Sequence, residues 1–161
     1  MNRKTPELNS GVCFINMKPK IIVDSREKHP WSFENSVTKK LEFGDYSIEG
    51  YEKNIAIERK TLDDFVGSVI QNWERFKEEI KGLSKINNSS SSFARIVIEG
   101  SIDDILLKKY TSSALPQAVL GRAISIEIDY GVPIIWAGSR QLARFYVDII
   151  FEMFYKRIGT K

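Results

Sequence analysis

One stretch of the sequence, GDYSIEGYEKNIAIERKTLDD at 44–64, constrains the fold more than any other. Residues 45–49 and 54–58 each alternate polar and apolar side chains, and the turn-forming Glu49-Gly50-Tyr51 lies between them. This pattern predicts a β-hairpin that is followed by the first turn of a helix.

The register of this hairpin decides which side chains share a face of the sheet. We pair Glu49 with Asn54 across the turn. Asp45 then lies opposite Glu58, and Lys60 follows on the same face, because successive side chains of a strand point to opposite faces. The other face is apolar and carries Tyr46, Ile48, Ile55 and Ile57.

Two carboxylates that face each other at one end of a hairpin need a physical explanation. Like charges directly opposite on a sheet destabilise it by up to ~1 kcal/mol. A divalent cation between the carboxylates would turn the repulsion into ligation. The alternative is an exposed hairpin whose charges are solvated. The run Glu58-Arg59-Lys60 favours the cation site, because it follows a strongly apolar strand, where three successive charges are not needed for solubility.

Composition narrows the chemistry that is open to the chain. Its 161 residues are 42% hydrophobic, which predicts one globular domain with a real core. The chain has one cysteine, Cys13, and one histidine, His29, so an intrachain disulfide is impossible and a Cys/His zinc site is nearly excluded. A Ser-His-Asp or Cys-His triad would need His29, whose sequence context predicts a surface loop. The lone cysteine fits a reducing compartment.

Charge and hydropathy indicate where the protein acts. The net charge of +3 permits nucleic-acid binding without requiring it. No apolar run approaches the ~20 residues that span a bilayer, and the N-terminus lacks the apolar core of a signal peptide. We therefore expect a soluble cytoplasmic protein with no membrane partner.

The chain before the hairpin contains one clear strand. Residues 1–19 have no usable periodicity and predict a flexible tail, with Met17 as an alternative start. Ile21–Asp24 predicts a short strand that is buried on both faces and ends in a carboxylate. Residues 29–40 predict a loop or a broken helix.

After the hairpin, helical and strand patterns alternate. A long helix is predicted from Thr61, because Thr61-Leu62-Asp63-Asp64 resembles a capping box and an apolar stripe continues for about six turns. The following elements are a strand at 93–99, a short helix at 102–110, a helix from 116 to 131, a strand at 132–136 and a final helix after Ser139. Pro133 places the last strand near a sheet edge. The sum is an α/β fold with a mixed sheet.

The final helix carries apolar residues on more than one side. Its main stripe consists of Leu142, Phe145, Tyr146, Ile149, Ile150, Met153, Phe154 and Ile158. Val147 and Phe151 lie off that stripe. A terminal helix of this kind often buries a second surface, so it is a candidate for dimerisation. The alternative is packing entirely within the chain.

Three short motifs together resemble the XPF-type structure-specific endonucleases. They are Val23-Asp24-Ser25-Arg26-Glu27, Gly44-Asp45-Tyr46, and Ile57-Glu58-Arg59-Lys60 with Asp64 beyond it. The family signature is a GD dipeptide, a spacer, ERK, three residues and an aspartate. The family belongs to the restriction-endonuclease-like class, the PD-(D/E)xK superfamily, in which an acid, a second acid and a lysine two residues later share the site.

The resemblance implies a fold and a domain organisation. We expect an α/β, restriction-endonuclease-like fold, in which helices flank a mixed β-sheet, as a single nuclease domain over residues 20–161. No helix-hairpin-helix pattern follows Gly159 and no helicase-like region is visible. The resemblance therefore implies a free-standing form of prokaryotic, archaeal or phage origin.

The resemblance also implies a metal-dependent site. Asp24, Asp45 and Glu58 are the expected oxygen ligands of Mg²⁺ or Mn²⁺, and together with Lys60 they form the expected catalytic set. Lys60 would orient the attacking water or stabilise charge that develops on the phosphate. The residues expected to support the site are Arg26, Glu27, Arg59 and Asp64.

Two of these supporting residues have further expected roles. Arg59 should point to the face opposite Glu58 and pair with Glu27 or Asp64. Asp64 should also cap the helix that begins at Thr61.

DNA would be held through its phosphates, which position the duplex without reading its sequence. The expected contacts are Arg26, Lys28, Arg140 and Arg144, with weaker candidates at Lys39, Lys40, Lys108 and Lys109. No recognition-helix pattern is present, which favours structure-dependent cleavage.

The expected function is a metal-dependent DNA endonuclease that hydrolyses phosphodiester bonds in branched, flapped or forked DNA during repair or recombination. The expected partner besides DNA is a second copy, bound through the C-terminal helix, or a different subunit. One alternative is a restriction-like or phage recombination nuclease with the same site. Another is a non-catalytic nuclease-fold subunit that binds DNA or scaffolds a partner, but the presence of Asp45, Glu58 and Lys60 favours the enzyme.

Overall fold

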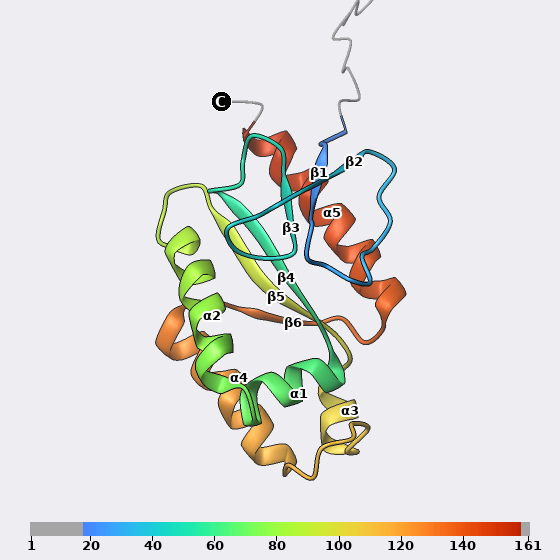
Figure 1. Cartoon of the computed structure of the whole chain (residues 1–161), viewed down its shortest axis with the longest axis vertical. Helices are drawn as coiled ribbons and strands as arrows, with labels where there is room; N and C mark the ends of the chain where they lie inside the picture. Colours follow the sequence, from blue (N-terminus) through green and yellow to red (C-terminus); the bar gives the residue numbers. More distant parts are fainter. Residues whose placement is uncertain (1–17, 159–161) are drawn as a thin grey trace, which may run out of the picture.

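Six strands form one mixed sheet in the order β2-β1-β3-β4-β5-β6 (Figure 1). The computed structural model describes residues 18–158, so nearly all of the predicted tail, and Met17 with it, lies outside the described residues. The strands are β1 (Ile21–Asp24), β2 (Ser36–Lys39), β3 (Tyr46–Ile48), β4 (Ile55–Thr61), β5 (Phe93–Glu99) and β6 (Ile134–Trp136). β3 runs antiparallel to β1 and β4, and the other neighbouring strands are parallel.

The predicted hairpin and its register are confirmed. Tyr46 pairs with Ile57 across β3 and β4, so Asp45 lies opposite Glu58 as expected. The peptide N–H of Asp45 donates to the carbonyl of Ile57 at 2.8 Å, which extends the pairing to the open end of the hairpin. Both faces of β4 are buried. On the face that also carries Glu58, Ala56 packs into the core with no exposed surface.

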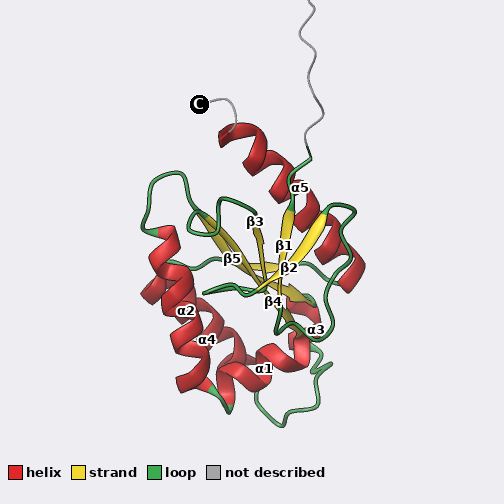
Figure 2. Ribbon diagram, turned by 45° about the horizontal axis from the view of Figure 1, so that its top comes forward, coloured by secondary structure: helices red, strands yellow, loops and turns green. Residues whose placement is uncertain are grey.

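Helices cover both faces of the sheet (Figure 2). They are α1 (Leu62–Ile70), α2 (Trp73–Asn87), α3 (Ile102–Leu106), α4 (Pro116–Tyr130) and α5 (Arg140–Ile158). One core joins α1, α2, α3 and α4 to one face, and a second core joins α5 to the other. This arrangement confirms the predicted restriction-endonuclease-like fold class, a mixed sheet flanked by helices. None of the helices between residues 18 and 158 is long and apolar enough to cross a membrane.

The capping box predicted at Thr61 is formed only in part, because among the described residues only its Thr61 half is present. The side chain of Thr61 accepts a hydrogen bond from the peptide N–H of Asp64 and caps α1. Ser101 and Asp104 form a reciprocal capping box at α3, although that helix is shorter than predicted. Gly131 ends α4 in the left-handed conformation (φ 63°), which favours glycine.

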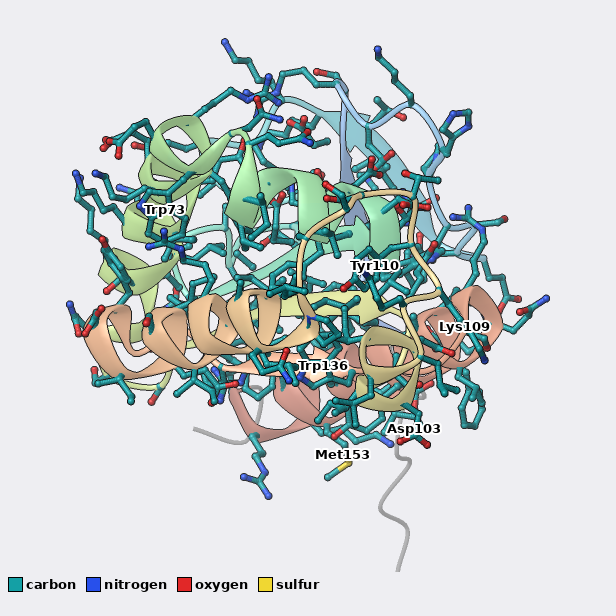
Figure 3. All side chains as sticks on the ribbon, turned by 90° about the horizontal axis from the view of Figure 1, so that it is seen from below. Trp73, Asp103, Lys109, Tyr110, Trp136 and Met153 are labelled. Carbon is teal, nitrogen blue, oxygen red and sulfur yellow. The ribbon has the colours of Figure 1, made fainter. Side chains whose placement is uncertain are left out.

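Two predictions for the middle of the chain were wrong. The long helix is divided into α1 and α2, because the N–H groups of Gln71 and Asn72 both donate to the carbonyl of Gly67 and close α1. The apolar stripe runs across the break since both helices pack on the same face of the sheet. On α2, Trp73, which is labelled in Figure 3, packs edge-on against Tyr130.

The predicted loop at 29–40 contains the edge strand β2. This strand, Ser36–Lys39, is mostly exposed and polar, so it carries no hydrophobic alternation that sequence reasoning could detect. It is placed by its backbone pairing with β1, a long-range interaction.

The buried side of α5 is not the side that carries most of its main apolar stripe. Val147 and Phe151, which lie off the main stripe, are fully buried against the sheet together with Ala143. Most of the stripe faces outward, and Met153 projects from the outer side of the helix with 48% of its surface exposed (Figure 3). Periodicity identifies the faces of a helix, but the shape of the surface beneath decides which face is buried, and small Ala143 allows close approach here.

Candidate active site

A cavity of about 790 Å³ lies at the open end of the hairpin. Its walls come from the ends of β1 and β4, the chain that leads into β3, and helices α1 and α2. The lining holds eight carboxylates, Asp24, Glu27, Glu42, Asp45, Glu58, Asp63, Asp64 and Glu79, against five cationic groups, Arg26, Lys28, Arg59, Lys60 and Arg75. The excess of acidic groups makes the cavity attractive to cations.

Asp45 and Glu58 lie side by side on the polar side of the hairpin, where Glu58 is buried and Asp45 is half-buried. One oxygen of Asp45, Oδ2, accepts a hydrogen bond from the peptide N–H of Arg59 at 2.7 Å. Burial raises the pKa of the Asp45 carboxyl to about 6. Burial and then the charge of Asp45 raise the pKa of the Glu58 carboxyl, which is 6% exposed, to about 8. The two groups therefore resist being ionised together unless a positive charge joins them.

Lys60 supplies one positive charge to this pair. Its ammonium Nζ is 2.9 Å from Oε1 of Glu58 and 3.5 Å from Oε2 of Glu79, and it lies 4.7 Å from the centre of the Phe76 ring. Burial alone would lower the pKa of Lys60, but the charges of Glu58 and Glu79 outweigh it and raise that pKa. Lys60 therefore remains charged inside the cavity.

Glu79 was missed by the sequence analysis. It lies on α2, 19 residues from Lys60, among other charged residues of a helix surface. Only the packing of α2 against β4 brings its carboxylate to the amine, so no local pattern distinguishes it from its exposed neighbours.

Asp24 lies at the end of β1 and lines the same cavity. Its Oδ1 accepts the N–H of Leu41 at 2.7 Å, and its Oδ2 accepts the Nε–H of Arg26 at 2.8 Å. Burial would raise the pKa of Asp24, but these hydrogen bonds lower it. Both oxygens are thus engaged by protein groups, and the role of Asp24 as a third metal ligand stays a prediction.

Arg59 points away from Glu58, as expected, and its side chain is buried. Its Nη1 is 3.4 Å from Glu27, one of its two predicted partners. Its stronger partner is Glu99, at 2.7 Å from Nε and 3.0 Å from Nη2. The sequence analysis missed Glu99, although a carboxylate that closes a predicted central strand is a usable signal. Asp64 instead lies in the first turn of α1 and lines the cavity.

Three of the four predicted DNA contacts are engaged within the protein. Arg26 donates to Asp24 and to the carbonyl of Leu41. Arg144 donates to the carbonyl of Ser32. Arg140 binds the carbonyls of His29 and Pro30 and the carboxylate of Glu99. Arg26 and Lys28 line the cavity, and Lys28 is exposed there.

The donor set of the cavity fits a hard divalent cation. Within residues 18–158 no three His, Cys, Asp or Glu side chains form a ready-made cation site. Mg²⁺ does not need such a site, because it keeps several waters and binds through one or two carboxylates. Burial raises the pKa values of Asp45 and Glu58 even though Lys60 lies beside them, and a divalent cation would add the charge that stabilises both ionised carboxylates.

Comparison with known proteins gives consistent results. The ERCC4 domain model matches residues 23–148. A Methanocaldococcus jannaschii protein, whose name describes it as an ATP-dependent RNA helicase, is 34% identical over 132 residues, which are 79% of this chain but 15% of that protein.

The solved structures of XPF from Aeropyrum pernix are similar in fold. One matches 89% of this chain and 66% of its own length, with a TM-score of 0.62 and 21% identity. The complex with DNA matches with a TM-score of 0.60 and 20% identity, over 88% of this chain and 65% of its own. The chain thus spans a minor part of the curated relative and just under two thirds of these structures. The match to the family model and the likeness in fold agree, and the chain belongs to the ERCC4 domain family.

Proposed function

We propose that this protein is a divalent-metal-dependent DNA endonuclease. The observation that carries the proposal is the convergence of Asp45, Glu58 and Lys60 in one acidic cavity at the open end of the hairpin. Two adjacent carboxylates and an amine form an arrangement that suits phosphodiester hydrolysis with a metal ion. Membership of the ERCC4 domain family supports it.

Asp45 and Glu58 would hold Mg²⁺ or Mn²⁺, with Asp24 as an additional ligand if it releases Arg26. A bound divalent ion lowers the pKa of water and offsets charge on a scissile phosphate. Arg26, once free of Asp24, offers a planar fork that suits a phosphate.

Lys60 acts on the phosphate from inside the cavity. Its ammonium stays charged because Glu58 and Glu79 surround it. An ammonium that is largely shielded from water, as Lys60 is with 14% of its side chain exposed, stabilises negative charge that develops on a phosphate more strongly than one in water does. It also donates hydrogen bonds that orient an attacking water molecule.

The proposed substrate is branched, flapped or forked DNA, in repair or recombination. Support comes from the XPF-type motifs and from the likeness to an XPF structure that was solved with DNA. Exposed Lys28 and Arg75 at the cavity lining are available for phosphates. An enzyme with this substrate works beside the chromosome, so we propose an intracellular, DNA-associated location in a prokaryotic or archaeal cell.

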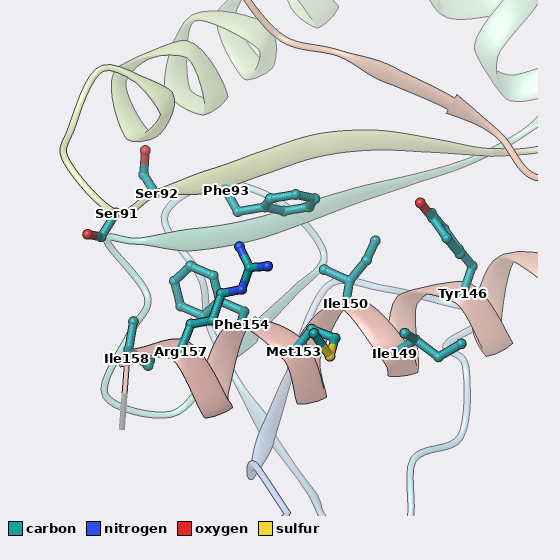
Figure 4. Close-up of a pocket in the computed structure, with 10 residues that line it drawn as sticks. All are labelled: Ser91, Ser92, Phe93, Tyr146, Ile149, Ile150, Met153, Phe154, Arg157 and Ile158. Carbon is teal, nitrogen blue, oxygen red and sulfur yellow. The ribbon is translucent and has the colours of Figure 1, made fainter. Parts of the chain in front are cut away.

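A protein partner is proposed on the outer side of α5. This side exposes the large apolar side chains Leu142, Phe145, Tyr146, Ile149 and Met153. Beside it a groove of about 720 Å³ opens between α5 and the start of β5, and Phe93 and Phe154 are among the side chains that line it (Figure 4). A contiguous apolar face of this kind marks an interaction site. We propose a homodimer or a related subunit there.

The test is cleavage of labelled flap, fork, nicked and plain duplex DNA with Mg²⁺ or Mn²⁺. Wild-type protein should cut branched DNA only with metal, and Asp45→Asn and Lys60→Ala should abolish cutting. Lys81→Ala is the matched control, because it removes a surface lysine that pairs only with Glu78 among the described residues. Pure wild-type protein that binds branched DNA but cuts none would reject the enzyme in favour of the scaffolding subunit.

A further inference from the structure

The carboxylate of Glu99 is a junction of four hydrogen bonds beside the active-site strand. Its side chain is 7% exposed. Oε1 accepts from Arg59 Nε at 2.7 Å, from Trp31 Nε1 at 2.8 Å and from Arg140 Nη1 at 3.1 Å, and Oε2 accepts from Arg59 Nη2 at 3.0 Å. Glu99 therefore ties together β4, β5, the loop between β1 and β2, and the first turn of α5.

Arg59 connects this junction to the catalytic groups through its peptide. While its guanidinium binds Glu99 on one side of β4, its N–H donates to Oδ2 of Asp45 at 2.7 Å on the other. The residues on either side of Arg59 are Glu58 and Lys60. The position of a single peptide thus sets the positions of two carboxylates and one amine.

Stability alone does not account for this buried ion pair. Desolvating two charges offsets most of their attraction, and apolar residues of similar size are often as stabilising. A bidentate contact between arginine and carboxylate instead contributes geometry, because two parallel hydrogen bonds fix the relative orientation of both groups. The guanidinium of Arg59 also lies 5.8 Å from the centre of the Trp31 ring, which limits its movement further.

We infer that Glu99 is a positioning residue of the proposed nuclease site. Acting through Arg59, it holds the end of β4 where Asp45 and Glu58 share a cation and Lys60 faces the phosphate. This inference rests on the proposed function. Residues that act on metal ligands in this indirect way typically change metal affinity or activity 10–100-fold when they are substituted.

The experiment compares wild type, Glu99→Gln and Glu52→Gln. The side-chain oxygen of Gln can still accept the hydrogen bond from Trp31. Towards Arg59, however, a neutral amide replaces the carboxylate. Glu52→Gln is the matched control, because it removes a carboxylate that pairs with Lys39 at the surface, away from the cavity. Mn²⁺ binding, measured by electron paramagnetic resonance, should weaken about 10–100-fold in Glu99→Gln alone. Single-turnover cleavage should slow by a similar factor, while affinity for branched DNA in Ca²⁺ and KM stay unchanged.

A second variant separates positioning from folding. Arg59→Lys keeps the charge but cannot form the fork, so it should show the same loss of Mn²⁺ affinity with a native circular dichroism spectrum. Folded variants that bind Mn²⁺ and cut DNA like wild type would overturn the inference, and so would unfolding of both variants. If wild type binds Mn²⁺ but cuts no DNA, the proposed function fails, and the Mn²⁺ affinities still decide the role of Glu99.

Discussion

Replacing Asp45 by Asn should stabilise the metal-free protein. The pKa of this carboxyl rises from 3.8 to about 6 in the folded state, chiefly by burial. A rise of this size corresponds to roughly 3 kcal/mol of unfavourable free energy for the ionised group. Asp45 keeps some contact with solvent and is coupled to Glu58, so we expect a gain of about 1–2 kcal/mol. Asn can still accept the Arg59 N–H through Oδ1, so the hydrogen bond at 2.7 Å survives.

The gain should depend on pH with a defined sign. The folded state holds the Asp45 proton more tightly than the unfolded state, so the contribution of this group to stability is complete below pH 3.8 and is lost as pH rises through about 6. The advantage of Asp45→Asn is therefore small at pH 4 and full at pH 8. Thermal unfolding with a chelator should show a Tm about 2–8 °C above wild type at pH 8.

Two further measurements complete this test. Asp148→Asn is the control, since Asp148 is a surface aspartate on α5 and its replacement should change stability by less than about 0.5 kcal/mol. Millimolar Mg²⁺ should stabilise wild type but not Asp45→Asn, because only the folded wild type holds the complete ligand pair. A Tm for Asp45→Asn at or below that of wild type at pH 8 would refute the reasoning that burial of the ionised Asp45 carboxylate costs stability.

Four further substitutions test the packing and one helix cap. Gly82→Ala should lose about 1–3 kcal/mol of stability in urea unfolding, because its new Cβ would lie 2.0 Å from Cδ1 of Phe43, and a gain would show that the ring moves freely. Phe151→Ala should cost about 3–5 kcal/mol, whereas Met153→Ala on the outer side of α5 should leave the unfolding of the monomer nearly unchanged; equal losses would contradict the described packing of that helix. Gly131→Ala should lower stability by about 1 kcal/mol, because φ at this position is 63°, and an unchanged Tm would argue against the left-handed cap.

Local patterns predicted much of the core of this protein. Alternation with a period of two predicted β3 and β4, and their register followed because a slip of one residue would turn the apolar face outward. The register in turn placed Asp45 opposite Glu58 and put Lys60 beside Glu58. The pairing of Tyr46 with Ile57 confirms this register. The helix caps were equally readable, because a cap involves residues only three apart in the chain.

What the tertiary structure decided involves partners that are distant in the sequence. The orientation of α5, the edge strand β2 and the contact of Glu79 with Lys60 each depend on packing or pairing across the sheet, which leaves no periodic trace in the segment itself. The same holds for Arg26, which the fold binds to the carbonyl of Leu41, and for the bond between Glu99 and Arg59. The sequence alone determined which chemical groups meet on the hairpin, because neighbouring strands impose a fixed alternation. Only the tertiary structure determined what surrounds and holds them, because side chains from five separate elements converge there.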